Sequence, residues 1–186
     1  MPKIFIDQGH NPVNPNAGAE GNGLREQDIT FEIGRILADL LNANPDFEAR
    51  TSRRTITEQL GTSTGSSLSA RVRAANEWGA DAFLSLHTNA SVNASATGVE
   101  AYAFRSGSDG FRLGEDTARQ LALITGLAYR GTFARPSLYV LRRTAMPAAL
   151  LEMGFITNPG DAALMRDQPD LFALGIYNGI LEYFGL

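Results

Sequence analysis

Short hydrophobic runs alternate along this chain with longer stretches in which apolar residues recur every three or four positions. The short runs predict β-strands at 3–7, 47–51, 81–86, 98–104, 137–141 and 147–155. The longer stretches predict helices at 29–41, 68–78, 109–128 and 173–184. Strands that alternate with helices indicate an α/β fold. We therefore expect a single domain, residues 1–186, with a central mixed, mostly parallel β-sheet flanked by helices on both faces.

The predicted elements are separated by stretches rich in turn-forming residues. The longest is QGHNPVNPNAGAEGNG (8–23), and Gly-, Pro- and Asn-rich loops of this length usually serve a function or are disordered. Ser66 or Ser67 is the expected N-cap of the second helix, and Gly79 is its expected end.

Composition and charge narrow the range of functions. Hydrophobic residues make up 44% of the 186 residues and charged residues 19%, which is typical of a globular domain. No apolar run approaches the ~20 residues that a membrane-spanning helix needs. The net charge is −4 and the basic residues are scattered, so we expect no nucleic-acid partner. The strand-like KIFID begins at Lys3, and no signal peptide is visible.

The histidines are the main candidates for chemistry, because the chain has only two and contains no cysteine. His10 follows the first predicted strand, and His87 ends the strand DAFLSL. In α/β proteins, ligands gather at the carboxyl ends of the strands. Glu26 stands at the edge of the first helix, and two imidazoles with one carboxylate are a usual ligand set for catalytic zinc.

Each of these residues also has an ordinary structural interpretation. A histidine after a strand is commonly a loop residue, and Glu26 alone suits the first turn of a helix. Glu152 is harder to explain in this way. It lies in the apolar run PAALLEMGF, where an unpaired carboxylate would cost several kcal/mol to bury. Because the spacings between these residues are too long to be diagnostic, the residues alone leave both interpretations open.

Five blocks of the chain, taken in order from residue 3 to the C-terminus, resemble the successive motifs of the zinc-dependent N-acetylmuramoyl-L-alanine amidases of the Amidase_3 family. They read IFIDQGHN, GLREQDITFEIGRILADLL, SARVRAANEWGADAFLSLHTNAS, GVEAY and MPAALLEMGFITNPGDAALM. The resemblance implies a Zn²⁺ ion bound by His10, Glu26 and His87. It also implies that Glu152 is the catalytic carboxylate. The implied reaction is cleavage of the amide bond between N-acetylmuramic acid and the L-alanine of the peptidoglycan stem peptide.

The implied mechanism combines zinc-activated water with a glutamate that acts as general base and then as general acid. Zinc would polarise the scissile carbonyl and lower the pKa of its water to roughly 7. Glu152 would accept the proton and deliver it to the leaving amine. Asn89 either positions the substrate or is a turn residue.

Several residues depart from the family pattern or compete with the assigned ones. Gln8 and Asn11 replace a proline and a glycine beside the first histidine, which affects the expected shape of the loop. Glu20 lies close enough in the sequence to compete with Glu26 as third ligand, although we expect a surface acid. Arg71 and Asn76 match a helical block, and we expect a surface or ion-pair residue and a structural hydrogen-bonding residue, respectively.

The resemblance also suggests where and how the protein acts. We expect a monomer that acts on peptidoglycan at an extracellular, periplasmic or cell-wall location, as a mature domain or a phage lysin. In some relatives a helical insertion after the second histidine blocks the zinc until an activator removes it. Only about 29 residues separate Thr88 from Thr117 here, so we expect an open site that needs no activator.

Three other functions are compatible with parts of this pattern. A zinc carboxypeptidase that acts on the stem peptide would share the ligand set but release a terminal amino acid. A wall-binding module would keep the fold without turnover, and Glu152 argues against it. A structural α/β domain with coincidental histidines would contain no zinc.

Overall fold

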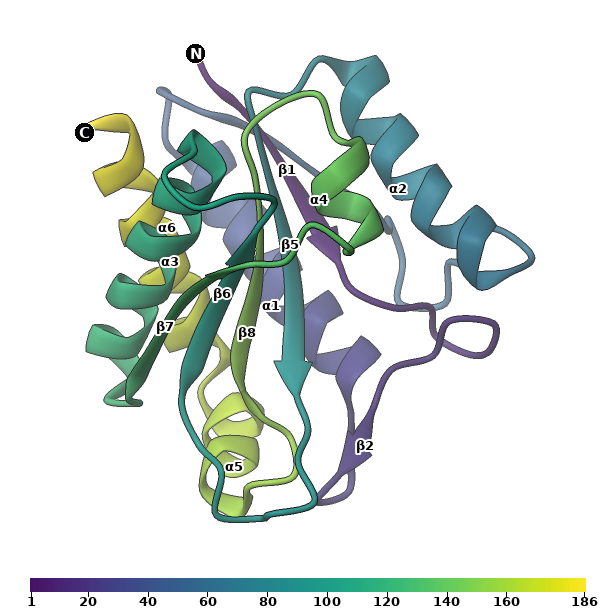
Figure 1. Ribbon diagram of the computed structural model, residues 1–186, viewed down its shortest axis with the longest axis vertical. Helices are drawn as coiled ribbons and strands as arrows, with labels where there is room; N and C mark the ends of the chain where they lie inside the picture. The colour runs from purple at the N-terminus through teal and green to yellow at the C-terminus, as the bar shows by residue number, and fades with distance from the viewer.

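A six-stranded sheet forms the centre of the molecule in the computed structural model, which describes residues 1–186 (Figure 1). In spatial order its strands are β4 (Glu48–Thr51), β1 (Lys3–Gln8), β5 (Ala82–Asn89), β8 (Ala148–Phe155), β6 (Val99–Ala103) and β7 (Tyr129–Ala134). The first four strands in this order run parallel, β6 is antiparallel to β8, and β7 is parallel to β6. The predicted mixed, mostly parallel sheet is confirmed.

Helices cover both faces of the sheet, as predicted (Figure 1). One face carries α1 (Glu26–Ala43), α3 (Asp109–Thr125) and α6 (Pro169–Phe184). The other face carries α2 (Thr64–Trp78) and the short α4 (Tyr139–Arg143). Helix α5 (Pro159–Asp167) follows β8, and a small hairpin of β2 (Glu20–Gly21) and β3 (Leu24–Arg25) precedes α1. None of these helices has both the length and the hydrophobicity that crossing a bilayer requires.

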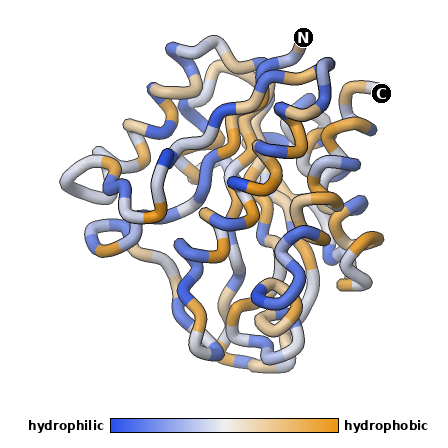
Figure 2. Tube along the Cα trace, turned by 180° about the vertical axis from the view of Figure 1, so that it is seen from behind, coloured by the Kyte–Doolittle hydropathy of each residue, from blue (hydrophilic) through white to orange (hydrophobic).

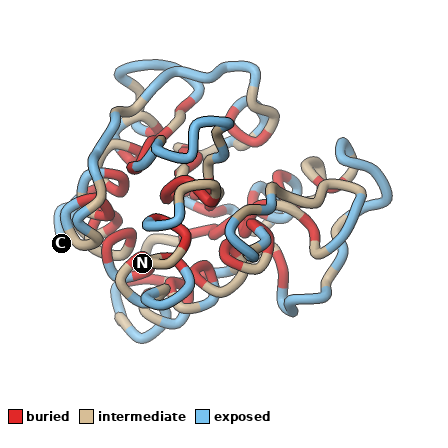
Figure 3. Tube along the Cα trace, turned by 90° about the horizontal axis from the view of Figure 1, so that it is seen from below, coloured by how far each residue is buried: buried red, intermediate tan, exposed pale blue.

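Each face of the sheet has its own hydrophobic core. The larger core packs α1, α3 and α6 against the sheet, and the smaller one packs α2 and α4. Figure 2 shows hydrophobic residues on the strands and on the helices around them, and Figure 3 shows the buried residues gathered inside the exposed loops. The sheet residues of these cores alternate between the two faces along a strand, with Ile4 and Ile6 in the larger core and Phe5 in the smaller one.

One predicted element has the wrong conformation, and two elements of the structure were not predicted. The predicted strand at 137–141 is a turn followed by α4, in which Val140 and Leu141 are buried in the smaller core. A short apolar run does not reveal its own periodicity, so packing decided its conformation. Strand β7 was not expected, because its exposed edge position does not require alternating apolar residues. The sequence also did not predict α5, which Asn158 caps through hydrogen bonds from Gly160 N and Asp161 N.

The second helix begins earlier than expected. Its N-cap is Ser63, which forms a reciprocal capping box with Ser66. Gly79 ends the helix in a left-handed conformation, as predicted.

Candidate metal centre and adjoining carboxylates

Three neighbouring strands bring the candidate residues to one edge of the sheet. His10 lies two residues beyond the end of β1, and His87 lies in β5, which is the next strand. Glu152 lies in β8 directly opposite His87 in the parallel register. Helix α1 begins with Glu26, so its first residue faces the loop that carries His10.

His10, Glu26 and His87 form one compact group, in which the possible ligand atoms all lie within 4.8 Å of one another. The distance from His10 Nε2 to Glu26 Oε2 is 3.2 Å, and the distance from His87 Nδ1 to Glu26 Oε1 is 3.1 Å. Each carboxylate oxygen therefore faces one imidazole, and Glu26 lies between the two rings.

The Glu26 side chain is held in place by main-chain donors as well as by the histidines. Thr88 N donates to Oε1 and Ala19 N donates to Oε2, each at 2.9 Å. The side chain is only 5% exposed. Burial opposes ionisation, but hydrogen bonds from His10 and His87 outweigh it and hold the pKa of Glu26 well below its usual range. Glu26 is therefore a fixed, ionised carboxylate rather than a solvated helix-end acid.

Two glycines leave the space that this group occupies. A Cβ on Gly9 would lie 2.6 Å from His87 Cε1, and a Cβ on Gly18 would lie 2.8 Å from Glu26 Oε2. Any larger residue at either position would force a ligand side chain to move. Both glycines come from the Gly-rich loop, which explains part of its unusual composition.

This donor set fits a zinc ion. Ligand atoms at the usual zinc distances in a tetrahedral site lie roughly 3.3 Å from one another. The two histidine–glutamate distances of 3.1 and 3.2 Å agree with that spacing.

Glu152 adjoins this group but is not bonded to it. Its Oε2 atom is buried and has no hydrogen-bond partner. Burial, together with the negative charges of Glu26 and Glu100, raises the pKa of Glu152 to about 8. The carboxyl group therefore has a pKa near neutrality, which suits a group that accepts and releases a proton.

Glu100 lies opposite Glu152 on the other side, in the antiparallel register of β6 and β8. It differs from Glu152 because it is paired, with Arg130 Nε at 2.5 Å and the Tyr102 hydroxyl at 2.5 Å. Of these two acids on adjacent strands, Glu100 is bonded to a cation and a hydroxyl, whereas Glu152 Oε2 has no hydrogen-bond partner. The sequence did not single out Glu100, although the block GVEAY contains it.

Asn89 lies at the end of β5, two residues beyond His87. Its side-chain oxygen accepts a hydrogen bond from Ala90 N at 2.9 Å, and its Nδ2 lies 3.5 Å from Glu100 Oε2. These contacts suit the turn role. Contact between Asn89 and the substrate stays a prediction.

The competing acid Glu20 lies outside the group. It is exposed in β2, as expected for a surface acid, and is not among the three residues that converge.

The two departures from the family pattern are both integrated into the fold. Gln8 donates from its side chain to Phe31 O and accepts from Arg53 N, and its own main-chain N–H donates to Ser52 Oγ. A proline at this position would lack that last donor. Asn11 is fully buried, and its amide bonds to main-chain atoms of Pro15 and Leu60.

Of the two roles expected for Arg71 in the helical block, surface residue or ion-pair residue, the structure shows the second. Arg71 is 1% exposed and is therefore not on the surface, and it forms an ion pair with Asp7 Oδ1 at 2.7 Å. Asn76 has the expected structural role, since its amide bonds to Arg143 O and Ala145 N.

A cavity of about 150 Å³ opens between the histidines and α4, lined by His10, His87, Arg71, Leu138, Tyr139 and Leu150 among others.

Comparison with known proteins gives a consistent result. The Amidase_3 model, described as N-acetylmuramoyl-L-alanine amidase, matches residues 4–182. The chain is 35% identical over 193 residues to the N-acetylmuramoyl-L-alanine amidase CwlM of Bacillus licheniformis, covering all of this chain and 70% of that protein.

Among solved structures, the catalytic domain of the amidase CwlV from Bacillus (Paenibacillus) polymyxa var. colistinus matches with 31% identity and a TM-score of 0.86, covering 100% and 99% of the two chains. An amidase from Clostridium difficile 630 matches with 29% identity and a TM-score of 0.88, covering 100% and 97%. The fold, the converging histidines and these similarities together show that the chain belongs to the Amidase_3 family of N-acetylmuramoyl-L-alanine amidases.

Proposed function

We propose that this amidase binds Zn²⁺ through His10, Glu26 and His87 and hydrolyses the amide bond between N-acetylmuramic acid and the L-alanine of the stem peptide. The observation that carries the proposal is the convergence of these three side chains within 4.8 Å, with Glu152 in register beside His87. We treat residues 1–186 as one catalytic domain.

When bound, zinc would supply Lewis-acid activation of the attacking water and of the scissile carbonyl. Glu152 would take a proton from the attacking water and pass it to the amine of L-alanine as the C–N bond breaks. Its unpaired Oε2 supports this role, because a carboxylate already engaged by a cation would be a weaker base. Glu100, which is engaged by Arg130, is for that reason the less suitable of the two acids.

We also propose that the enzyme works as a monomer on peptidoglycan outside the cytoplasm or in the cell wall, without an activator. Support for an open site comes from the stretch between β5 and α3, which contains β6 and a loop at 90–98 but no helix. Asn89, beside this loop, stays a proposed substrate contact.

The decisive experiment combines product analysis with variants of the acids. Purified peptidoglycan digested by the wild type should release stem peptides with a free L-alanine amino group, detected by mass spectrometry. Release of a terminal D-amino acid would instead indicate a carboxypeptidase.

Variants then separate proton transfer from metal binding. Glu152→Gln should retain zinc but lose about 10²- to 10⁴-fold in kcat. Glu26→Gln should lose zinc, whereas the control Glu20→Gln should keep both zinc and activity. Full activity in Glu152→Gln would refute the role of Glu152, and a wild type that binds no zinc would refute the metal site.

A further inference from the structure

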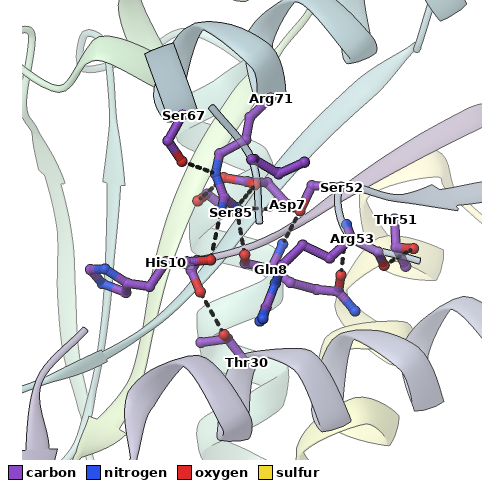
Figure 4. Close-up of polar contacts among 12 residues, drawn as sticks. Asp7, Gln8, His10, Thr30, Thr51, Ser52, Arg53, Ser67, Arg71 and Ser85 are labelled. Carbon is purple, nitrogen blue, oxygen red and sulfur yellow. Dashed lines mark hydrogen bonds and ion pairs between the residues drawn. The ribbon is translucent and has the colours of Figure 1, made fainter. Parts of the chain in front are cut away.

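The main-chain segment that carries His10 is held by side chains from both faces of the sheet (Figure 4). Arg71 on α2 donates from Nη1 to Gln8 O and from Nη2 to His10 O, each at 2.5 Å. Thr30 on α1 donates to Gly9 O at 2.8 Å. The carbonyl groups of three successive residues therefore all bond to side chains that lie far away in the sequence.

His10 needs such support because of its backbone conformation. Its φ angle is 69°, in the left-handed region that residues other than glycine rarely adopt. A residue persists in this region only when its surroundings hold it there. The same backbone conformation directs the carbonyl of His10 toward Arg71 and its ring toward Glu26. Figure 4 shows the His10 ring turned away from Arg71 and Asp7.

The guanidinium group of Arg71 bonds to several acceptors at once, which requires donors in a fixed plane as well as a positive charge. Besides the two carbonyls, its Nη1 contacts Asp7 Oδ1 at 2.7 Å, and Asp7 Oδ2 accepts a hydrogen bond from Ser85 Oγ at 2.7 Å. Its Nη2 also lies 3.3 Å from Asn11 Oδ1. Guanidinium offers several donors in one plane, whereas the ammonium group of lysine is a point charge on a flexible stem.

Stability alone gives a weak reason to bury this ion pair. Arg71 and Asp7 are each 1% exposed, and replacing a buried ion pair with well-packed apolar residues is often neutral or stabilising. An apolar pair could not donate to the carbonyls of Gln8 and His10. The property that only the arginine provides is the fixed orientation of the segment that ends in His10.

We propose that Arg71 is the positioning residue of the metal centre, acting through the carbonyl of His10 and held in its own orientation by Asp7. This inference rests on the proposed zinc site. Arg71 would not touch zinc or substrate. It would lower the cost of presenting the His10 ring to the ion, because the ring is already oriented before the ion binds.

The test is the conservative variant Arg71→Lys, which keeps a positive charge for Asp7 but cannot bond to both carbonyls in one plane. Zinc affinity, measured by competition with a chromophoric chelator, should fall about 10- to 100-fold, the range found when groups that orient a ligand are removed. The visible absorption spectrum of the Co²⁺-substituted variant should also change, because it reports the geometry of the ligands.

A matched control is Arg53→Lys. Arg53 is also 1% exposed, and its Nη2 donates to a main-chain carbonyl, that of Gln27, at 2.6 Å. Its side chain does not bond to residues 8–10. This variant should lose thermal stability but keep the zinc affinity and the Co²⁺ spectrum of the wild type.

A further variant covers the case in which Arg71→Lys does not fold. Combining Asp7→Asn with Arg71→Met removes both charges, so no buried ion is left unpaired, yet His10 O still loses its donor. The double variant should show the same loss of zinc affinity.

Folded Arg71 variants that bind zinc as tightly as the wild type, with an unchanged Co²⁺ spectrum, would overturn the inference while leaving the proposed function intact. A wild-type protein that binds no zinc would overturn the metal site itself, and this inference with it.

Discussion

At the scale of single residues, the two acids nearest the histidines differ because of what bonds to them. Glu26 receives main-chain hydrogen bonds from Ala19 and Thr88 and lies between two imidazoles, so it stays ionised. The Oε2 atom of Glu152 is buried without a hydrogen-bond partner, so the neutral form of this acid is favoured up to a pKa of about 8. One residue therefore suits permanent ligation and the other suits proton transfer.

The raised pKa of Glu152 predicts a pH-dependent stability of the metal-free protein. Because the folded-state pKa of about 8 lies above the ordinary value of 4.5, the folded state binds this proton more tightly than the unfolded state does. The stability that this proton contributes is complete below pH 4.5 and is lost as the pH rises to about 8. Glu152→Gln should therefore match the wild type in acid and have a higher Tm at pH 9, when metal-free samples are compared by calorimetry.

The control for this comparison is Glu20→Gln, which changes an exposed acid and should leave the difference between pH 5 and pH 9 unaltered. An equal dependence of Tm on pH in Glu152→Gln and the wild type would contradict the role assigned to burial.

At the scale of elements, the functional residues are positioned by the register of the strands and by where helices α1 and α2 lie against the sheet. His87 and Glu152 are paired by the register of β5 and β8, so a shift of one residue would turn one of them to the opposite face. Glu26 is the first residue of α1, and Arg71 lies in the middle of α2. Strand register and helix placement therefore affect the candidate metal centre as well as the fold.

The capping box of α2 gives a test at this scale. Ser63→Ala removes the side chain that accepts from Ser66 N, and loss of such a cap costs about 1 kcal/mol. For a protein of this size that corresponds to a decrease in Tm of about 2–4 °C. Ser106→Ala is the control, because Ser106 is exposed and outside any helix or strand. Equal Tm values for the two variants would show that the cap does not stabilise α2.

At the scale of the whole molecule, the candidate ligands come from three distant parts of the chain. The loop after β1, the start of α1 and strand β5 each supply one of them. An unfolded chain would not bring these groups together, so zinc should bind the folded state with strong preference and stabilise it.

The prediction for the whole molecule is a zinc-dependent Tm. At a zinc concentration of about 100 times the Kd, binding adds about 2.7 kcal/mol of stability. We therefore expect Tm to rise by roughly 5–10 °C relative to a sample treated with a chelator. Glu26→Gln should show little of this shift, since it lacks the central carboxylate. A wild-type Tm that does not respond to zinc would contradict binding at this group.

By itself, the sequence determined the class of fold and the residues available for imidazole chemistry. Alternating hydrophobic runs and helical stripes are local patterns, and they predicted most strands and the main helices. The run at 137–141 and strand β7 were missed because packing against α2 and an edge position in the sheet decided their conformations. Composition alone restricted imidazole chemistry to His10 and His87, because the chain contains no other histidine.

The tertiary structure decided how these residues are used. Burial of Arg71 and Asp7, the fixed position of Glu26, and the alignment of His87 with Glu152 all depend on contacts between residues about 60 or more positions apart. No local pattern records such contacts, because hydrogen bonding and desolvation of a side chain depend on which elements fold against it. For this reason the sequence could identify the ionisable groups, whereas their relative pKa values and the support of the His10 loop became visible only in the folded chain.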